Sequence, residues 1–155
     1  MGIFRRFLGG KPAAREPPKP QRLDYLNEAL ALERQGDYDA AITSYRLALR
    51  DHPNDPRILQ NLAIAFSRTG QAEEAVRHYR RALDADPILA GAHYGLAFLL
   101  LKRGDAAGAE QHLTAFLGNP PHGVDAQKWI AHAERALAEL RDADGAPRAA
   151  KMEGA

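Results

Sequence analysis

The chain has 155 residues, enough for one domain with tails, and its 21 Lys and Arg against 20 Asp and Glu give a formal net charge of only +1. This balance gives no strong positive electrostatic field that would attract nucleic acid. The absence of cysteine excludes disulfides, thiol catalysis and cysteine-ligated zinc. The longest apolar run, Leu96–Leu101, is much shorter than the ~20 residues that cross a membrane. We therefore predict a cytoplasmic protein without a nucleic-acid partner.

Residues 1–21 differ in composition from the rest of the chain. They hold five cations and one acid, a formal charge of +4 that leaves −3 for residues 22–155. Four prolines between positions 12 and 20 disfavour a helix, so we predict a basic, Pro-rich, disordered tail. At its tip, apolar residues recur at helical spacing; they are Ile3, Phe4, Phe7 and Leu8.

The tip has two interpretations besides plain disorder. Apolar residues beside Arg5 and Arg6 suit a weak peripheral contact with the anionic inner face of a membrane. A short segment that docks on another protein is the alternative. Because eight residues form only a marginal helix in water, all of these interpretations stay open.

Residues 22–123 contain an internal repeat of 34 residues, in the blocks 22–55, 56–89 and 90–123. The residues that match in every block are small or end a helix: Ala29, Ala63 and Ala97; Gly36, Gly70 and Gly104; Ala41, Ala75 and Ala109; Pro53, Pro87 and Pro121. A glycine after an apolar-periodic segment ends one helix, the alanines let two helices approach closely, and the proline ends the second. Each block therefore predicts a helix–turn–helix hairpin.

A seventh helix is expected after the third block. Asp125 can cap it, and apolar residues then recur at helical spacing: Trp129, Ile130, Ala133, Leu137 and Leu140. Its other face is charged, as the end of a stack of repeats requires for solubility, so we assign residues 124–141 as a capping segment. Residues 142–155 are rich in Ala, Gly and charge and are predicted to form a flexible tail.

In combination, these blocks resemble the tetratricopeptide repeat (TPR). The resemblance is carried by segments such as Leu32–Ala41 (LERQGDYDAA), followed by Asp51–Asn54 (DHPN). It covers residues 22–141 and implies an all-α protein, a right-handed α-solenoid of three helix–turn–helix repeats with a C-terminal capping helix. One departure is Glu28, which stands where leucine is usual and where the later blocks have Leu62 and Leu96.

The resemblance also implies a concave groove lined by the first helix of each block. The residues that the family pattern places there include Leu26, Leu30, Asn61, Ile64, Arg68, Tyr94, Phe98 and Lys102. A mostly apolar lining with a few amides and cations suits a hydrophobic peptide segment of a partner protein. The alternative is that the capping helix, or a second copy of the chain, covers Tyr94, Phe98 and Leu101.

Members of the family that hold the C-termini of heat-shock chaperones carry Lys and Asn in the first block and Lys and Arg in the third. The corresponding positions here are Leu26, Leu30, Gly91 and Gly95. Only Asn61, in the second block, agrees with that pattern. We therefore do not expect a carboxylate clamp.

No residue pattern indicates catalysis, a metal or a cofactor. His78 and His112 occupy equivalent places in neighbouring blocks, but no acid completes a metal-ligand set, and neither Ser44 nor Ser67 lies in a nucleophile motif. The sequence thus predicts a non-enzymatic protein-interaction adaptor whose tip could tether it to the inner face of a membrane. The alternative function is a structural or self-assembling subunit of a larger, envelope-associated complex; the oligomeric state stays open.

Overall fold

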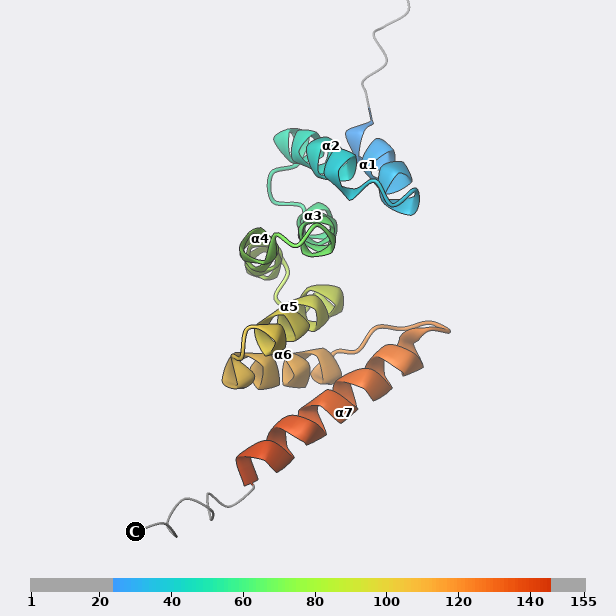
Figure 1. The fold of residues 1–155 in the computed structure, drawn as a ribbon. Helices are drawn as coiled ribbons and strands as arrows, with labels where there is room; N and C mark the ends of the chain where they lie inside the picture. Colours follow the sequence, from blue (N-terminus) through green and yellow to red (C-terminus); the bar gives the residue numbers. More distant parts are fainter. Residues whose placement is uncertain (1–23, 146–155) are drawn as a thin grey trace, which may run out of the picture.

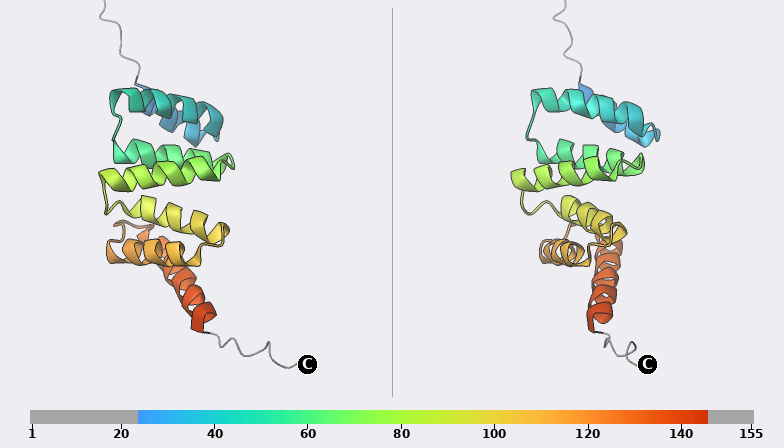
Figure 2. Two further views of the ribbon diagram at one scale, coloured as in Figure 1. Left: turned by 90° about the vertical axis from the view of Figure 1, so that its left-hand side faces the viewer. Right: turned by 60° about the vertical axis from the view of Figure 1, so that its left-hand side comes forward.

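The computed structural model describes residues 24–145, which form seven α-helices and no strand (Figure 1). The helices are α1 (Tyr25–Arg34), α2 (Tyr38–Asp51), α3 (Pro56–Arg68), α4 (Ala72–Ala85), α5 (Ala90–Lys102), α6 (Ala106–Gly118) and α7 (Ala126–Gly145). They pair as three hairpins, α1–α2, α3–α4 and α5–α6, and each hairpin packs on the next through its second helix (Figure 2). The predicted all-α solenoid of three helical repeats with a C-terminal helix is confirmed.

The turn within each hairpin follows from the repeated glycine. Gly36, Gly70 and Gly104 have φ values of +80°, +76° and +80°, the left-handed conformation that glycine adopts without a steric penalty. The residue after each glycine donates its backbone N–H to a carbonyl in the preceding helix; for Asp37 the acceptor is Leu32, at 3.0 Å. Each first helix therefore ends in a Schellman-type cap.

Aspartate side chains begin most of the helices. The carboxylate of Asp24 accepts a hydrogen bond from the backbone N–H of Asn27, and those of Asp37 and Asp105 do the same at α2 and α6. Asp55 caps α3 directly before Pro56, where the missing N–H of proline removes no helical hydrogen bond. Such caps typically contribute about 1 kcal/mol each, so the helix starts are determined locally.

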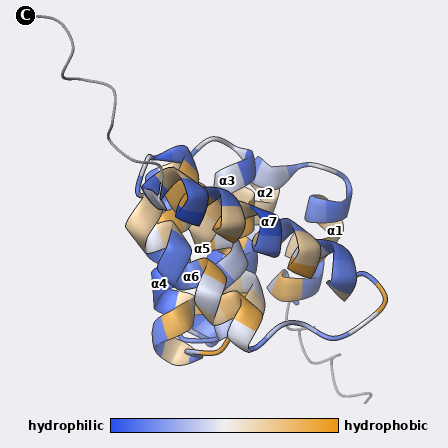
Figure 3. Cartoon of the chain, turned by 90° about the horizontal axis from the view of Figure 1, so that it is seen from below, coloured by the Kyte–Doolittle hydropathy of each residue, from blue (hydrophilic) through white to orange (hydrophobic). Residues whose placement is uncertain are grey.

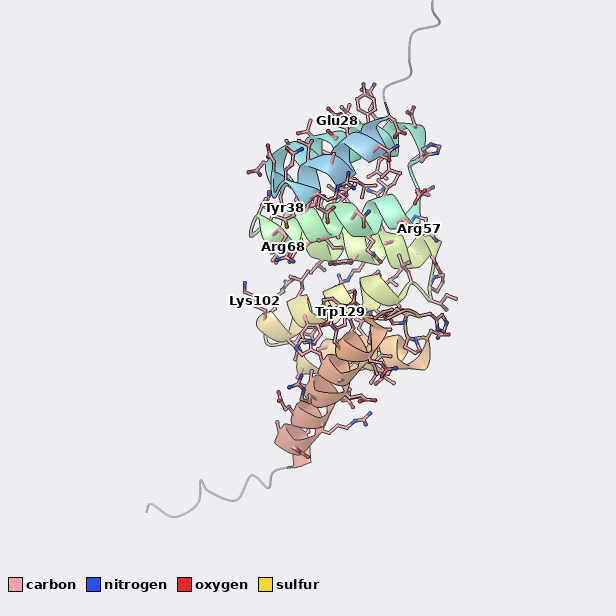
Figure 4. All side chains as sticks on the ribbon, turned by 90° about the vertical axis from the view of Figure 1, so that its right-hand side faces the viewer. Glu28, Tyr38, Arg57, Arg68, Lys102 and Trp129 are labelled. Carbon is pink, nitrogen blue, oxygen red and sulfur yellow. The ribbon has the colours of Figure 1, made fainter. Side chains whose placement is uncertain are left out.

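The core lies where the hairpins contact one another. The repeated alanines Ala29, Ala41, Ala63 and Ala75 are fully buried, and the large buried side chains include Tyr45, Phe66, Leu62 and Leu96. The unusual Glu28 is exposed on α1, whereas its equivalents Leu62 and Leu96 are fully buried (Figure 4). Among the described residues no earlier hairpin packs on α1, so a charged residue is tolerated there.

The last helix closes the stack and runs further than the sequence indicated. Ala133 and Leu137 of α7 are buried against Leu113 and Phe116 of α6, and the exposed side of α7 is polar (Figure 3). The helix continues to Gly145, so the predicted boundary at Arg141 was four residues too early. Residues 142–144 contain neither glycine nor proline, so they are compatible with helix as well as with a frayed end.

His78 is a buried titratable side chain in the α3–α4 hairpin. Its ring lies 5.1 Å from the ring of Phe66, and its Nδ1 lies 2.8 Å from the backbone oxygen of Glu74. Because a carbonyl oxygen only accepts, Nδ1 carries the proton of the neutral ring. Burial is the largest cause that lowers the pKa of His78 below its usual 6.5, and burial also lowers the pKa of His112.

We expect these two histidines to make the fold less stable as the pH falls. Below about pH 6.5 the unfolded chain binds protons at His78 and His112 before the folded chain does, so the free energy of unfolding decreases. Above that pH both states hold neutral rings and the contribution is constant. Urea unfolding at about pH 7.5 and about pH 5.5 measures the change. His78→Gln should reduce the pH dependence; an unchanged slope would show that His78 does not contribute.

Candidate functional site

The first helices of the three hairpins share one face of the stack, here called the inner face. Of the eight predicted groove residues, Leu26, Leu30, Asn61, Ile64, Tyr94 and Phe98 are half-buried, and Arg68 and Lys102 are exposed. Figure 4 shows this face, with Arg68 and Lys102 toward one edge and Trp129 on the neighbouring α7. The side chains of Leu26, Leu30 and Ile64 pack on the core with one side and leave the other side in solvent.

A buried tyrosine on α2, the second helix of its hairpin, binds polar side chains of α1 and α3 at the inner face. The hydroxyl of Tyr45 on α2 donates a hydrogen bond to the carboxylate of Glu33 on α1 and also interacts with the side chain of Asn61 on α3. Burial and the nearby carboxylate raise the pKa of Tyr45 well above its usual 10, so the hydroxyl stays protonated. Glu33 and Asn61 are therefore held in place rather than free to turn.

Two glycines make room on α5 for side chains of the preceding hairpin. A Cβ atom on Gly95 would lie 2.3 Å from the hydroxyl oxygen of Tyr79, and one on Gly91 would lie 2.5 Å from the side-chain oxygen of Gln60. Both distances are far inside van der Waals contact. A side chain at Gly95 would have to displace the buried ring of Tyr79, whereas the flexible end of Gln60 can turn away from Gly91. The lack of a cation at both positions and the filled space at Gly95 argue against a carboxylate clamp here.

The capping helix takes part in the inner face at α5. The hydroxyl of Tyr94 hydrogen bonds to Nδ1 of His132, and the rings of Phe98 and His132 stack with centroids 4.5 Å apart and an interplanar angle of 3°. Trp129 approaches Tyr94 edge-on at 5.4 Å. Tyr94 and Phe98 are therefore partly covered by α7. Leu101, which the alternative interpretation also named, packs on the core of the earlier helices instead, and Leu26, Leu30 and Ile64 have no cover from α7 among the described residues.

Trp129 and His132 are inner-face residues that the sequence analysis did not place there. Trp129 was assigned only to the apolar side of the cap, yet 44% of its surface is exposed. Trp129 and His132 are three residues apart and so lie on one side of α7. This spacing is the sequence feature that could have grouped them. It could not show which helix that side would face.

Family models for the tetratricopeptide repeat match the chain at residues 26–88 and at residues 68–122. Together the two matches cover more than half of the sequence. The chain belongs to the tetratricopeptide repeat family. A search of curated protein sequences gives no match.

Solved TPR structures have the same fold. The type III secretion translocator chaperone SycD of Yersinia enterocolitica is 17% identical with a TM-score of 0.72, covering 78% of this chain and 83% of SycD. SycD in complex with a peptide of the translocator YopD is 18% identical with a TM-score of 0.72, covering 77% and 92%. The TPR domain of Sgt2 from Aspergillus fumigatus is 28% identical with a TM-score of 0.66, covering 89% of each chain.

His78 and His112, which hold equivalent places in neighbouring blocks, have different partners in this TPR protein. His112 lies beside His93 of its own hairpin, with 2.9 Å between the two Nδ1 atoms, while His78 packs on Phe66. Nε2 of His93 lies 2.8 Å from the carbonyl oxygen of Pro87 and so carries a proton, which leaves its Nδ1 to accept from His112. Residues 24–145 contain no group of three or more His, Asp or Glu placed to hold a metal ion.

The predicted membrane tip, Ile3, Phe4, Phe7 and Leu8, lies outside the described residues. Within the described part of the chain, no helix combines the length and the apolar character needed to span a membrane.

Proposed function

We propose that this TPR protein is a non-enzymatic, cytoplasmic adaptor that binds a peptide segment of another protein on its inner face. The observation that carries the proposal is the row of half-exposed apolar side chains on successive first helices, Leu26 and Leu30 on α1 and Ile64 on α3. The peptide complex of SycD, which shares the fold, supports a partner of this kind. Burial of apolar area would supply most of the affinity.

Polar side chains around this row would set the orientation of the peptide. Asn61 is positioned by Tyr45, and an amide can pair with the N–H or C=O of a peptide backbone. The guanidinium of Arg68 lies 6.0 Å from the ring centre of Tyr38, at the edge of the face, with Lys102 nearby in the next hairpin (Figure 4). A mainly apolar segment with an acidic residue at this edge would match the arrangement.

Replacing Ile64 with aspartate should weaken capture of the partner by about tenfold or more, because a charge would stand where apolar area is buried. Ile88→Asp is the matched control, since Ile88 is 64% exposed on the α4–α5 connection, away from the inner face. The full chain and both variants serve as bait in native lysate, followed by titration of the captured protein. Equal capture by all three, with the helical content unchanged, would contradict the assignment of the inner face.

The proposal includes a tether formed by Ile3, Phe4, Phe7 and Leu8, together with Arg5 and Arg6. The full chain should co-sediment with vesicles containing anionic phosphatidylserine severalfold more than with neutral phosphatidylcholine vesicles, since both apolar insertion and charge attraction contribute. A chain that begins at Arg22 should lose this difference. Equal partitioning of the two chains would remove the tether from the proposal.

The alternative function, a self-assembling subunit, would use the same exposed surface. A second copy could cover Trp129 and the uncovered residues of α1 and α3. Sedimentation velocity separates the two functions: a monomer at all concentrations supports the adaptor. A dimer that is lost in Ile64→Asp but kept in Ile88→Asp supports self-assembly.

A further inference from the structure

A concave site lies between α4 and the turn that joins α5 to α6, and none of the predicted groove residues lines it. It is a crevice of about 550 Å³. Its lining combines four arginines, Arg77, Arg80, Arg81 and Arg103, with the carboxylates of Glu73 and Asp105 and the buried side chains of Val76 and Leu100. The formal charge of this lining is +2, although residues 22–155 as a whole carry −3.

The guanidinium groups of this crevice are only partly neutralised. Arg103 pairs with Glu73 at 3.0 Å, but their side chains are 41% and 77% exposed, so water screens the pair and the guanidinium can turn to another anion. Arg77 pairs with Glu74 on its own helix. Arg80 has no hydrogen bond or ion pair within residues 24–145.

The other charged side chains of the crevice, Arg81 and Asp105, each have a partner, but these contacts do not neutralise the positive charge of the crevice. Arg81 donates from one terminal nitrogen to the backbone oxygen of Pro53 at 3.2 Å, which leaves its other N–H groups available. Asp105 accepts from the backbone N–H of Gly108 at 2.9 Å and is used as the cap of α6. The free donors thus belong mainly to Arg80 and Arg81.

The repeat itself does not require these arginines. At the position of Arg77, the first and third hairpins have Thr43 and Gln111. At the position of Arg80 they have Arg46 and Thr114, and at the position of Arg81 they have Leu47 and Ala115. Like charges three and four residues apart on one helix repel each other, so the cluster is unfavourable for α4 alone. A cluster confined to one hairpin and placed around a crevice indicates a bound anion.

We propose that this crevice binds a phosphate monoester, presented by a phosphorylated side chain of a partner protein. A phosphate monoester carries a charge near −2 at neutral pH, which matches the two arginines that have no acidic partner, Arg80 and Arg81, whereas one carboxylate would match only one of them. The planar guanidinium groups of Arg80 and Arg81 suit its oxygens, because each can donate two parallel hydrogen bonds. Val76 and Leu100 would contact the carbon atoms of the phosphorylated residue.

The test titrates the full chain with three probes: a short glycine-flanked phosphoserine peptide, its unphosphorylated counterpart, and inorganic phosphate. Binding is followed by the NMR signals of the arginine Nε–H groups and by calorimetry. The phosphoserine peptide should bind, and Arg80→Gln combined with Arg81→Gln should weaken it by about tenfold or more, because charge-assisted hydrogen bonds are lost. Arg80→Gln alone, which breaks no hydrogen bond or ion pair of the described residues, should weaken it in the same direction.

Arg50→Gln is the matched control, since it removes the same charge from an exposed position on α2 outside the crevice. Equal loss of binding in this control, equal binding of the unphosphorylated peptide, or no effect of the double substitution would overturn the proposal. Inorganic phosphate that binds as tightly as the peptide, and is lost in the double variant, would support the phosphate site and overturn its assignment to a partner's side chain. The inner face plays no part in this test, so its result is independent of the adaptor function.

Discussion

Replacing Phe66 with alanine should lower the free energy of unfolding by about 3–5 kcal/mol. Phe66 is fully buried near the end of α3, where its ring contacts His78 of α4 and lies 5.4 Å from the guanidinium carbon of Arg46 of α2. It therefore joins the first hairpin to the second. Because a domain of this size is stabilised by only about 5–15 kcal/mol in total, the loss would be a large fraction of its stability.

Urea unfolding followed by circular dichroism measures this change. Phe98→Ala is the matched control, because Phe98 is half-buried beside α7 and its removal leaves a space that water can enter. It should destabilise the fold less than Phe66→Ala does. A loss below about 1 kcal/mol for Phe66→Ala would contradict the packing described here.

Gly95→Ala should destabilise the protein by about 1–3 kcal/mol, although alanine is the better helix former by about 1 kcal/mol. The added methyl group would lie 2.3 Å from the hydroxyl oxygen of Tyr79 and 2.4 Å from the ring carbon that bears it, so α5 or the tyrosine must shift. Tyr79 is only 4% exposed and has little room to move.

A double-mutant cycle separates this clash from a general effect of the substitution. In a Tyr79→Leu background, Gly95→Ala should cost less, because the atoms that it would meet are gone. Gly118→Ala is the control: Gly118 is exposed at the end of α6 with no atom within 4 Å of the added carbon, and its replacement should be close to neutral. A stabilising Gly95→Ala would show that Tyr79 does not fill this space.

The clash also bears on what the inner face can recognise. Clamp-forming TPR proteins need long cationic side chains at the positions of Gly91 and Gly95, but this chain has no side chain at either, and the buried ring of Tyr79 fills the space beside Gly95. Leucines stand at the matching positions of α1. An apolar segment rather than a C-terminal carboxylate therefore suits the proposed binding face.

The sequence alone determined the features that depend on contacts within a few residues. The 34-residue period, the helix ends at Gly36, Gly70 and Gly104 and the aspartate cap at Asp37 were all predictable, because a left-handed turn or an N-cap forms between near neighbours. The fully buried alanines were predictable too, since the same close approach of helices recurs in each block. The one local feature that was wrong is the end of α7, because residues 142–144 contain neither glycine nor proline to end the helix before Gly145.

Tertiary structure alone decided which side chains of different helices meet. His132 reaches Tyr94 across 38 residues, the hydroxyl of Tyr45 reaches Glu33 and Asn61 from the second layer, and His112 pairs with His93. The rotation of one helix about its axis and its tilt against the next determine such contacts. Periodicity shows that α7 has an apolar side. Only the packing of the whole stack shows that Trp129 and His132 of α7 cover Tyr94 and Phe98 of α5, whereas Leu26, Leu30 and Ile64 on α1 and α3 have no such cover.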